Sequence, residues 1–301
     1  MIRAAFRSLR VYQWTKNLVL FAGPIFTLRI LDPPIALAAG AGFLAFSLAA
    51  SGVYVLNDIL DVKADRLHPE KRTRPVASNA LPIPVAALLA ALLFAVGLGG
   101  AAALGGRFAA TALAYVALTT VYSTLLKKVV LLDVIAIAAG FVLRAVAGVE
   151  LVRDRTHLGP EGIAISPWLL VCAFFLALFL ATGKRLHELE TLERDAALHR
   201  PSLGAYTRPL LDQLIAVVTG ATLLAYSIYT IAPETLAKYE GRPLYLTVPF
   251  VLYGIFRYLY LLYAERKGGN PSEHLLRDRA TFVNVVLWCA CVLAILLWPA
   301  P

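Results

Sequence analysis

The sequence carries little charge for its length, and this scarcity excludes most classes of soluble protein. Only 16% of its 301 residues are Asp, Glu, Lys or Arg, whereas 59% are hydrophobic. A water-soluble domain carries about 25% charged residues. Together with a mean hydropathy of +0.72, the composition predicts an integral membrane protein. It excludes a disordered chain and an ordinary cytosolic enzyme.

Cysteine is also scarce, which excludes a disulfide-stabilised scaffold. Cys172, Cys289 and Cys291 all lie in apolar runs, and no cysteine or histidine has the spacing of a zinc site. No small-residue cleavage site follows the basic N-terminal segment, so we expect no signal peptide.

Long apolar runs are abundant, and nine of them approach the length of about 20 residues that crosses a membrane. They are Leu18–Leu31, Ile35–Leu56, Leu81–Leu104, Phe108–Leu126, Val129–Val152, Pro167–Thr182, Pro209–Ile231, Leu244–Tyr263 and Ala280–Trp298. We therefore expect an all-α polytopic membrane protein, with residues 1–301 in a single transmembrane domain. Residues 1–16, where basic and apolar side chains alternate, predict an amphipathic helix in the membrane interface.

Basic residues are distributed unevenly between the two sets of predicted loops. The N-terminus and the loops after the even-numbered runs hold twenty Lys and Arg, against six in the other loops. This bias predicts a cytoplasmic N-terminus and an external C-terminus in the cell (inner) membrane. The net charge of +9 is then explained by loops near anionic lipid headgroups, and we expect no nucleic-acid partner.

The predicted cytoplasmic loop 57–80 opens with an acidic motif. Asn57, Asp58, Asp61 and Asp65 fall within an arc of roughly 100° if the preceding helix continues. Neighbouring carboxylates repel one another unless a cation joins them, and oxygen ligands suit Mg²⁺ or Mn²⁺. We therefore expect these four residues to bind a metal ion.

A basic run follows in the same loop, with Lys71, Arg72 and Arg74 within four residues. Guanidinium groups pair well with phosphate oxygens. Acidic residues that can bind a metal ion, followed directly by basic residues that can bind phosphate, favour a diphosphate-binding site. The alternative is a solvated loop in which acids and bases pair with one another, and the regular spacing at the membrane edge favours the site.

This loop resembles the first aspartate motif of the UbiA superfamily of intramembrane prenyltransferases. The resemblance rests on Asn57-Asp58-x-x-Asp61-x-x-x-Asp65 followed by Arg72-Thr73-x-Pro75. It implies nine transmembrane helices around a central cavity open to the cytoplasmic side. It also implies Mg²⁺-bound diphosphate, with Asp58, Asp61 and Asp65 as catalytic residues.

The second predicted cytoplasmic loop, 183–208, departs from the usual members of that superfamily. Lys184 and Arg185 stand where paired acids are expected, so a second group of magnesium ligands is not expected. Two cations at a helix end suit a phosphate group. Alternatively, Lys184 pairs with Glu188 four residues later, whereas Arg185 has no such obvious partner.

The altered loop resembles the branch of the superfamily that transfers phosphoribose to decaprenyl phosphate in cell-wall arabinan precursor synthesis. Further similarity lies in Arg10-Val11-x-Gln13-Trp14-x-Lys16-Asn17, Leu132-Asp133, Ser202-Leu203-x-x-Tyr206-Thr207 and Pro271-x-x-x-Leu275-x-x-Asp278. The resemblance implies a magnesium-dependent pentosyltransferase. Its donor would be 5-phosphoribosyl 1-diphosphate and its acceptor a polyprenyl phosphate.

Charges inside the predicted spans are functional candidates, because they are costly in a membrane. We expect Arg144 to line the cavity, the alternative being a structural ion pair with an acid of another helix. The acceptor phosphate then has two candidate sites, one around Lys127, Lys128 and Arg144 and one around Lys184 and Arg185. The sequence leaves this choice open.

Two other functions remain as rivals. An aromatic prenyltransferase would use a prenyl diphosphate and a second pair of acids, which this loop lacks. A transporter or channel would need paired half-helices or an inverted repeat, and the sequence shows neither. The lipid chain length, the number of metal ions and assembly into a homo-oligomer stay open.

Overall fold

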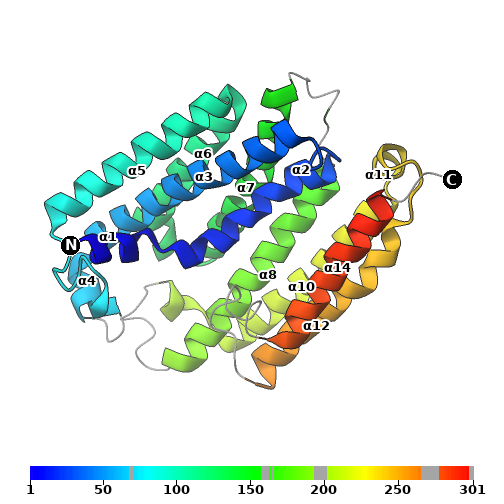
Figure 1. The fold of residues 1–301 in the computed structure, drawn as a ribbon. Helices are drawn as coiled ribbons and strands as arrows, with labels where there is room; N and C mark the ends of the chain where they lie inside the picture. Colours follow the sequence, from blue (N-terminus) through cyan, green and yellow to red (C-terminus); the bar gives the residue numbers. More distant parts are fainter. Residues whose placement is uncertain (68–70, 157–162, 164–165, 193–201, 266–277, 298–301) are drawn as a thin grey trace. The chain divides into compact units, whose positions relative to one another are not determined.

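The structure, a computed structural model, describes residues 1–67, 71–156, 163, 166–192, 202–265 and 278–297 (Figure 1). The described residues form helices and turns without a strand, which confirms the predicted all-α fold for this part of the chain. Seven helical segments in it are long and apolar enough to cross a membrane. They are Pro33–Leu60, Ile83–Leu104, Leu132–Thr156, Pro167–Thr191, Arg208–Ile231, Leu244–Tyr263 and Arg279–Leu297.

Two of the nine predicted runs are not among these seven. Leu18–Leu31 falls on the 3-10 helix η1 (Val11–Phe21), the short helix α2 (Ala22–Phe26) and a turn. Phe108–Leu126 does form a helix, α6 (Gly106–Thr124). Its Arg107 and its many Thr, Ser and Tyr hydroxyl groups make it less apolar than the other seven.

The chain divides into two compact units. The first comprises residues 1–126 and 143–164, and the second comprises residues 127–142 and 165–301. Helix α7 (Leu132–Thr156) contributes its first part to the second unit and the rest to the first.

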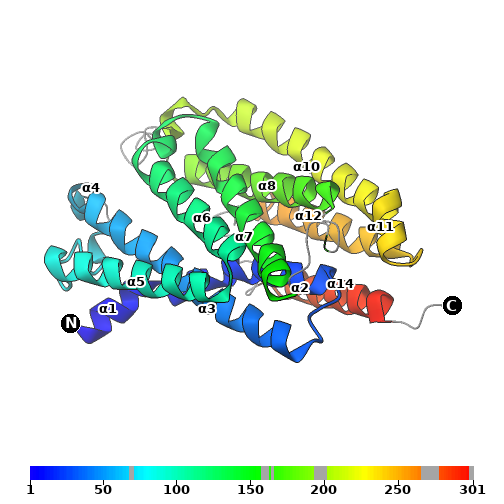
Figure 2. The ribbon, with the colours of Figure 1, turned by 90° about the horizontal axis from the view of Figure 1, so that it is seen from above.

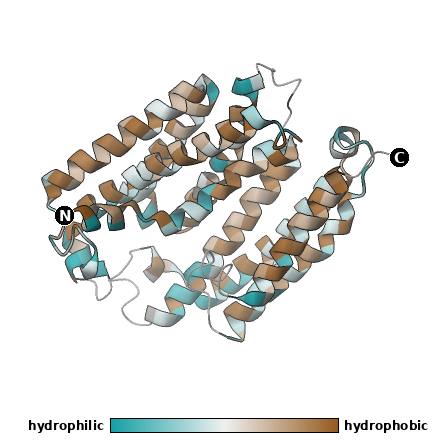
Figure 3. Ribbon diagram, in the orientation of Figure 1, coloured by the Kyte–Doolittle hydropathy of each residue, from teal (hydrophilic) through white to brown (hydrophobic). Residues whose placement is uncertain are grey.

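The first unit is built around α3. Its remaining elements are α1 (Ile2–Leu9), η1, α2, α4 (Val62–Leu67), η2 (Lys71–Thr73), α5 (Ile83–Leu104) and α6. Helices α3 and α5 lie side by side (Figures 1 and 2). The bare Gly97 of α5 permits this, because a Cβ there would lie 2.6 Å from the Ala49 nitrogen of α3. Hydrophobic residues cover most of α5, whereas hydrophilic residues gather around α4 (Figure 3).

A second close approach joins the N-terminal segment to α7 within the same unit. A Cβ on Gly148 would lie 1.9 Å from the Leu20 carbonyl oxygen, and one on Gly23 would lie 2.2 Å from the Gly148 carbonyl carbon. Around this crossing Leu20, Phe46 and Leu151 are fully buried. The amphipathic helix predicted for residues 1–16 is shorter in the structure, because α1 ends at Leu9 and Arg10 has a left-handed backbone conformation.

The second unit packs α8 (Pro167–Leu192) against α10 (Arg208–Ile231), and α12 (Val248–Tyr263) against α14 (Arg279–Leu297). The short elements η5 (Leu203–Ala205), α11 (Pro233–Lys238) and η6 (Leu244–Thr247) lie between these helices in the chain, and η3 (Leu126–Lys128) precedes α7. Phe179, Leu211, Ile215 and Leu262 are buried in its core.

Candidate active site

The acidic motif lies where α3 passes into α4. Helix α3 ends at Leu60, and Asp61 forms a turn before α4 begins at Val62. Helical hydrogen bonding nevertheless continues, because the Asp61 nitrogen donates to the Asn57 carbonyl at 2.9 Å and the Asp65 nitrogen donates to the Asp61 carbonyl at 2.8 Å. The predicted ligands therefore follow one another on consecutive turns.

Two arginines bind the buried carboxylates of this motif. Asp58 is only 1% exposed and Asp65 is also buried. Arg74 Nη1 lies 2.7 Å from Asp65 Oδ2 and 3.3 Å from Asp58 Oδ1. Arg10 donates to the same Asp58 Oδ1. Arg10, Asp58, Asp65 and Arg74 thus form a cluster in which the two carboxylates are matched by two guanidinium groups, and we call it the acid–arginine cluster.

Two oxygens beside this cluster accept no hydrogen bond within the described part of the chain. They are Asn57 Oδ1 and Asp58 Oδ2, and both are buried. A buried polar atom without a partner costs about 1–3 kcal/mol. Amide and carboxylate oxygens are ligands that Mg²⁺ prefers, so these two atoms fit the coordination of a divalent cation.

The structure does not gather the three predicted carboxylates around one point. Among the described residues, no three Asp, Glu, His or Cys side chains are arranged to hold a metal ion together. Asp61 is partly exposed at the turn, whereas Asp58 and Asp65 are buried. Metal binding by Asn57, Asp58, Asp61 and Asp65 stays a prediction, supported by the two unpartnered oxygens.

The basic run predicted to bind phosphate is brought only partly into the cluster. Arg74 belongs to it, Lys71 is half-buried in η2, and Arg72 is exposed to solvent. The Arg74 nitrogen donates to the Lys71 carbonyl at 2.9 Å, which fixes the turn between them. Residues 68–70 of the predicted loop lie outside the described residues.

Arg10 is a residue of this cluster that the sequence analysis did not assign to the site. The alternation of basic and apolar residues placed it on an interfacial helix. A usable signal was present in α3, where the polar positions Ser47, Ser51, Tyr54 and Asp58 share one helical face. A polar face on a buried helix indicates a polar partner segment.

Arg144 of α7 lies in the interior of the first unit. Its Nε donates to Asn17 Oδ1 at 2.8 Å and its Nη2 donates to the Tyr115 hydroxyl at 2.7 Å. The guanidinium carbon also lies 4.6 Å from the centroid of the Tyr115 ring. Asn17 in turn donates to Ser47 Oγ at 2.9 Å. These contacts fix the orientation of the Arg144 side chain. A role of Arg144 in substrate binding stays a prediction.

Lys184 and Arg185 lie in the second unit, on α8. Lys184 pairs with Glu188 at 3.6 Å, as the alternative reading of this helix expected. The expectation that Arg185 has no obvious partner is wrong. Its Nε donates to Asp133 Oδ2 at 2.8 Å and its Nη1 donates to Glu188 Oε2 at 2.6 Å, and the residue is only 1% exposed.

Asp133 is the centre of this buried network. Besides Arg185, it accepts hydrogen bonds from the Tyr206 hydroxyl at 2.7 Å and from Ser202 Oγ at 3.3 Å. Burial, together with the hydrogen bond to Asp133, raises the pKa of Tyr206. Ser202 Oγ also lies 2.9 Å from the Lys127 carbonyl oxygen. The network therefore joins α8 and residues 202–206 to the segment that carries Lys127. Residues 193–201 of the second predicted loop lie outside the described residues.

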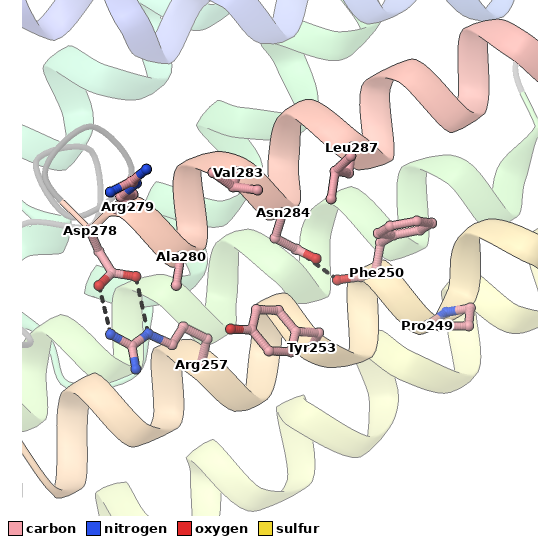
Figure 4. Close-up of a pocket in the computed structure, with 10 residues that line it drawn as sticks. All are labelled: Pro249, Phe250, Tyr253, Arg257, Asp278, Arg279, Ala280, Val283, Asn284 and Leu287. Atoms are coloured by element: carbon pink, nitrogen blue, oxygen red, sulfur yellow. Dashed lines mark hydrogen bonds and ion pairs between the residues drawn. The ribbon is translucent and has the colours of Figure 1, made fainter.

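A groove of 760 Å³ runs between α12 and α14 (Figure 4). Its walls are mainly apolar, and one end holds Arg257, whose Nη2 and Nε lie 2.7 and 3.1 Å from the Asp278 carboxylate. In the middle, Asn284 Nδ2 donates to the Phe250 carbonyl at 2.9 Å. Because Arg257 is paired with an acid, the groove suits an apolar chain better than a phosphate. Pro271 and Leu275 of the motif that ends at Asp278 lie outside the described residues.

Comparison with known proteins gives a consistent result over nearly the whole chain. The UbiA prenyltransferase family matches residues 18–275. The chain is similar to the decaprenyl-phosphate phosphoribosyltransferases of Mycobacterium tuberculosis and Corynebacterium glutamicum. The first is 30% identical, over 97% of this chain and 94% of the relative, and the second is 34% identical, over 97% and 87%.

Among solved structures, a UbiA homolog from Archaeoglobus fulgidus bound to GPP and Mg²⁺ has a similar fold. The TM-score is 0.72 at 20% identity, and the match covers 98% of this chain and 99% of the other. At this level of identity the similarity shows the fold alone.

Proposed function

Because the chain belongs to the UbiA prenyltransferase family, and is therefore a membrane transferase, we propose that it transfers 5-phosphoribose from 5-phosphoribosyl 1-diphosphate to a polyprenyl phosphate such as decaprenyl phosphate. Diphosphate is released. The relatives that support this choice are named for that activity and are 30–34% identical over 97% of the chain. The product would enter cell-wall arabinan precursor synthesis.

The observation that carries the proposal is the acid–arginine cluster with its two unpartnered oxygens. Asn57, Asp58, Asp61 and Asp65 would hold Mg²⁺, with Mn²⁺ as a chemical equivalent. When bound, the ion would neutralise the charge that develops on the departing diphosphate. Arg74, together with Lys71 and Arg72, would bind the outer phosphate oxygens of that group.

Little acid–base chemistry is required of the protein. The acceptor phosphate is already an anion at neutral pH, so catalysis would rest on positioning and electrostatics. Lys127, Arg144, Lys184 and Arg185 are the proposed cations for the acceptor phosphate and the donor 5-phosphate, and the division between them is open.

The same proposal includes the arrangement in the membrane. The chain would cross the inner membrane nine times around a central cavity, with the N-terminus and the acidic motif on the cytoplasmic side and the C-terminus outside. The described residues supply seven helices suited to crossing. The polyprenyl phosphate would reach the protein from the surrounding lipid, and assembly into homo-oligomers is open.

The test is transfer of radiolabelled phosphoribose from its diphosphate into polyprenyl phosphate by membranes that contain the protein. We expect label in the lipid for the wild type and a loss of 100-fold or more, on the order of 3 kcal/mol, for Asp61→Ala. Asp32→Ala is the matched control, because Asp32 lies at the opposite end of α3 in an exposed pair with Arg29.

Unchanged transfer by Asp61→Ala would defeat the metal assignment. The same membranes, incubated with a prenyl diphosphate and an aromatic acceptor, test the rival aromatic prenyltransferase. Product from that mixture, with no label entering polyprenyl phosphate, would replace the proposed donor and acceptor.

A further inference from the structure

The N-terminal segment lies along one polar face of α3. Asn17 Nδ2 donates to Ser47 Oγ at 2.9 Å, and Trp14 Nε1 donates to Ser51 Oγ at 3.0 Å. Further along the same face, Arg10 reaches Asp58. The α3 positions 47, 51 and 58 share a face because they are four and seven residues apart. The segment is therefore held in one register that ends at the acidic motif.

Arg10 occupies a special position in that register. Its backbone has φ 50° and ψ 50°, the left-handed conformation in which α1 ends and η1 begins. This conformation is sterically unfavourable for a residue with a Cβ, and such conformations persist where the surrounding contacts enforce them. The guanidinium carbon lies 5.4 Å from the centroid of the Tyr54 ring and the guanidinium group binds Asp58. Tyr54 and Asp58 thus orient the cation at the motif.

The charges of the acid–arginine cluster are balanced as the structure shows them. Arg10 and Arg74 offset Asp58 and Asp65, and both arginines bind the same oxygen of Asp58. A divalent cation on the unpartnered Oδ2 of Asp58 would share that carboxylate's charge and repel the arginines on Oδ1, so the cation and the arginines compete for the same carboxylate. Once bound, it leaves the four side chains and the ion with a net charge of +2, which favours a polyanion such as a diphosphate.

We propose that Arg10 is a diphosphate-binding residue of this site, which Asp58 holds in place until a divalent cation takes that carboxylate. The proposal rests on the proposed function, because it assigns Arg10 to the leaving group of that reaction. Released from Asp58, the guanidinium group donates to phosphate oxygens, its preferred planar partners. Arg10 therefore opposes metal binding and favours diphosphate binding.

These opposite effects give the test, which needs no catalytic turnover. Purified full-length protein in detergent is titrated with Mn²⁺ alone by electron paramagnetic resonance. It is then titrated with inorganic diphosphate at saturating Mn²⁺ by calorimetry. For Arg10→Ala we expect Mn²⁺ to bind about 3-fold or more tightly, because a competitor is lost. We expect diphosphate to bind about 10-fold or more weakly, because charge-assisted hydrogen bonds are lost.

Two further variants guard against a general loss of structure. Arg10→Lys keeps the charge and should recover part of the diphosphate affinity, without the full strength of a bidentate contact. Arg7→Ala removes the same charge from an exposed position of α1 and should leave both affinities unchanged.

The proposal is overturned if Arg10→Ala weakens Mn²⁺ and diphosphate binding together, which indicates a structural role. It is also overturned if diphosphate affinity matches the wild type. If Arg10→Ala shows the two opposite effects but the wild type transfers no phosphoribose, the role of Arg10 is supported and the proposed donor is removed. The two failures are therefore distinguishable.

Discussion

At the residue scale, Arg185, Arg10 and Arg74 all bind buried carboxylates, and the partners of each carboxylate decide what the arginine can do. Arg185 is almost completely buried and binds Asp133 and Glu188. Arg10 and Arg74 share one oxygen of Asp58, and the second oxygen of that carboxylate has no hydrogen-bond partner in the part of the chain that the structure describes. The first arrangement is complete within the protein, whereas the second leaves an oxygen free for a cation.

The Arg185 network gives a prediction about stability. Arg185→Gln leaves the Asp133 charge buried without its cation, so we expect it to destabilise the protein by about 3–5 kcal/mol. The double variant Asp133→Asn/Arg185→Gln removes both charges and should recover much of that loss. Thermal unfolding in detergent, followed by tryptophan fluorescence, measures both. If Arg185→Gln unfolds like the wild type but binds donor weakly, the network is not structural and Arg185 is a phosphate ligand.

Residue types and spacing identified part of the candidate site. Asn57, Asp58 and Asp65 stand out because their spacing matches the helix period. Arg10 was missed because its partner Asp58 is 48 residues away in the chain. Asn17, which binds Arg144 across 127 residues, was missed for the same reason. Such pairs depend on packing between helices, which local periodicity does not report.

At the element scale, the closest helix crossing depends on glycine. A Cβ on Gly148 of α7 would overlap the Leu20 carbonyl oxygen, whereas a Cβ on Gly99 of α5 would meet nothing within 4 Å. We expect Gly148→Ala to separate the two segments and destabilise the protein by several kcal/mol, on the order of 3. Gly99→Ala is the matched control and should stabilise it by about 0.5–1 kcal/mol. Thermal unfolding distinguishes them, and equal midpoints would contradict the close crossing.

The first predicted span does not form one long helix, for a reason connected with the same crossing. Residues 18–31 are apolar enough to suggest a helix that crosses the membrane, but the structure divides them into η1, α2 and a turn. Gly23 allows α2 to contact the backbone of α7 at Gly148. Hydropathy measures how apolar a run is and carries no information about such backbone contacts. The long runs that became α3, α5, α7 and α8 needed no such information.

The start of α14 gives a prediction about pH. The Arg257 guanidinium beside Asp278 holds the pKa of that carboxyl well below its usual range. The unfolded chain therefore takes up a proton at a higher pH than the folded chain does. The stabilisation from this pair should be complete above about pH 4, the ordinary value for Asp, and should disappear as the pH falls further.

Two substitutions test this at the element scale. In the wild type the Thr281 nitrogen donates a hydrogen bond to Asp278 Oδ2 at 2.9 Å. Asp278→Asn removes the ion pair but keeps a side-chain oxygen that can accept this hydrogen bond. Asp278→Ala also removes this helix cap and should cost about 1 kcal/mol more. We expect the difference in unfolding temperature between wild type and Asp278→Asn to be largest near pH 7 and to shrink below pH 4. A difference that does not change with pH would contradict the assignment.

At the scale of the whole molecule, the distribution of charge links the proposed chemistry to one side of the membrane. The loops predicted to be cytoplasmic hold twenty basic residues, and the others hold six. The acidic motif and Arg74 lie in the basic set. A soluble, phosphorylated donor can reach the motif only from the compartment that this loop faces. Sidedness is therefore a condition of the proposed function, and it can be tested without an assay of transfer.

The test uses single cysteines on the two predicted sides. Ser78 lies exposed in the loop of the acidic motif, and Glu240 lies exposed after α11. In a background in which the three native cysteines are replaced by alanine, we expect a membrane-impermeant maleimide to label Glu240→Cys in intact cells. Ser78→Cys should react only after the membrane is permeabilised. Labelling of Ser78→Cys in intact cells would place the acidic motif outside the cell, beyond the reach of a cytoplasmic donor. The phosphoribosyl proposal would then fail, even if the acid–arginine cluster bound Mn²⁺ and diphosphate as expected.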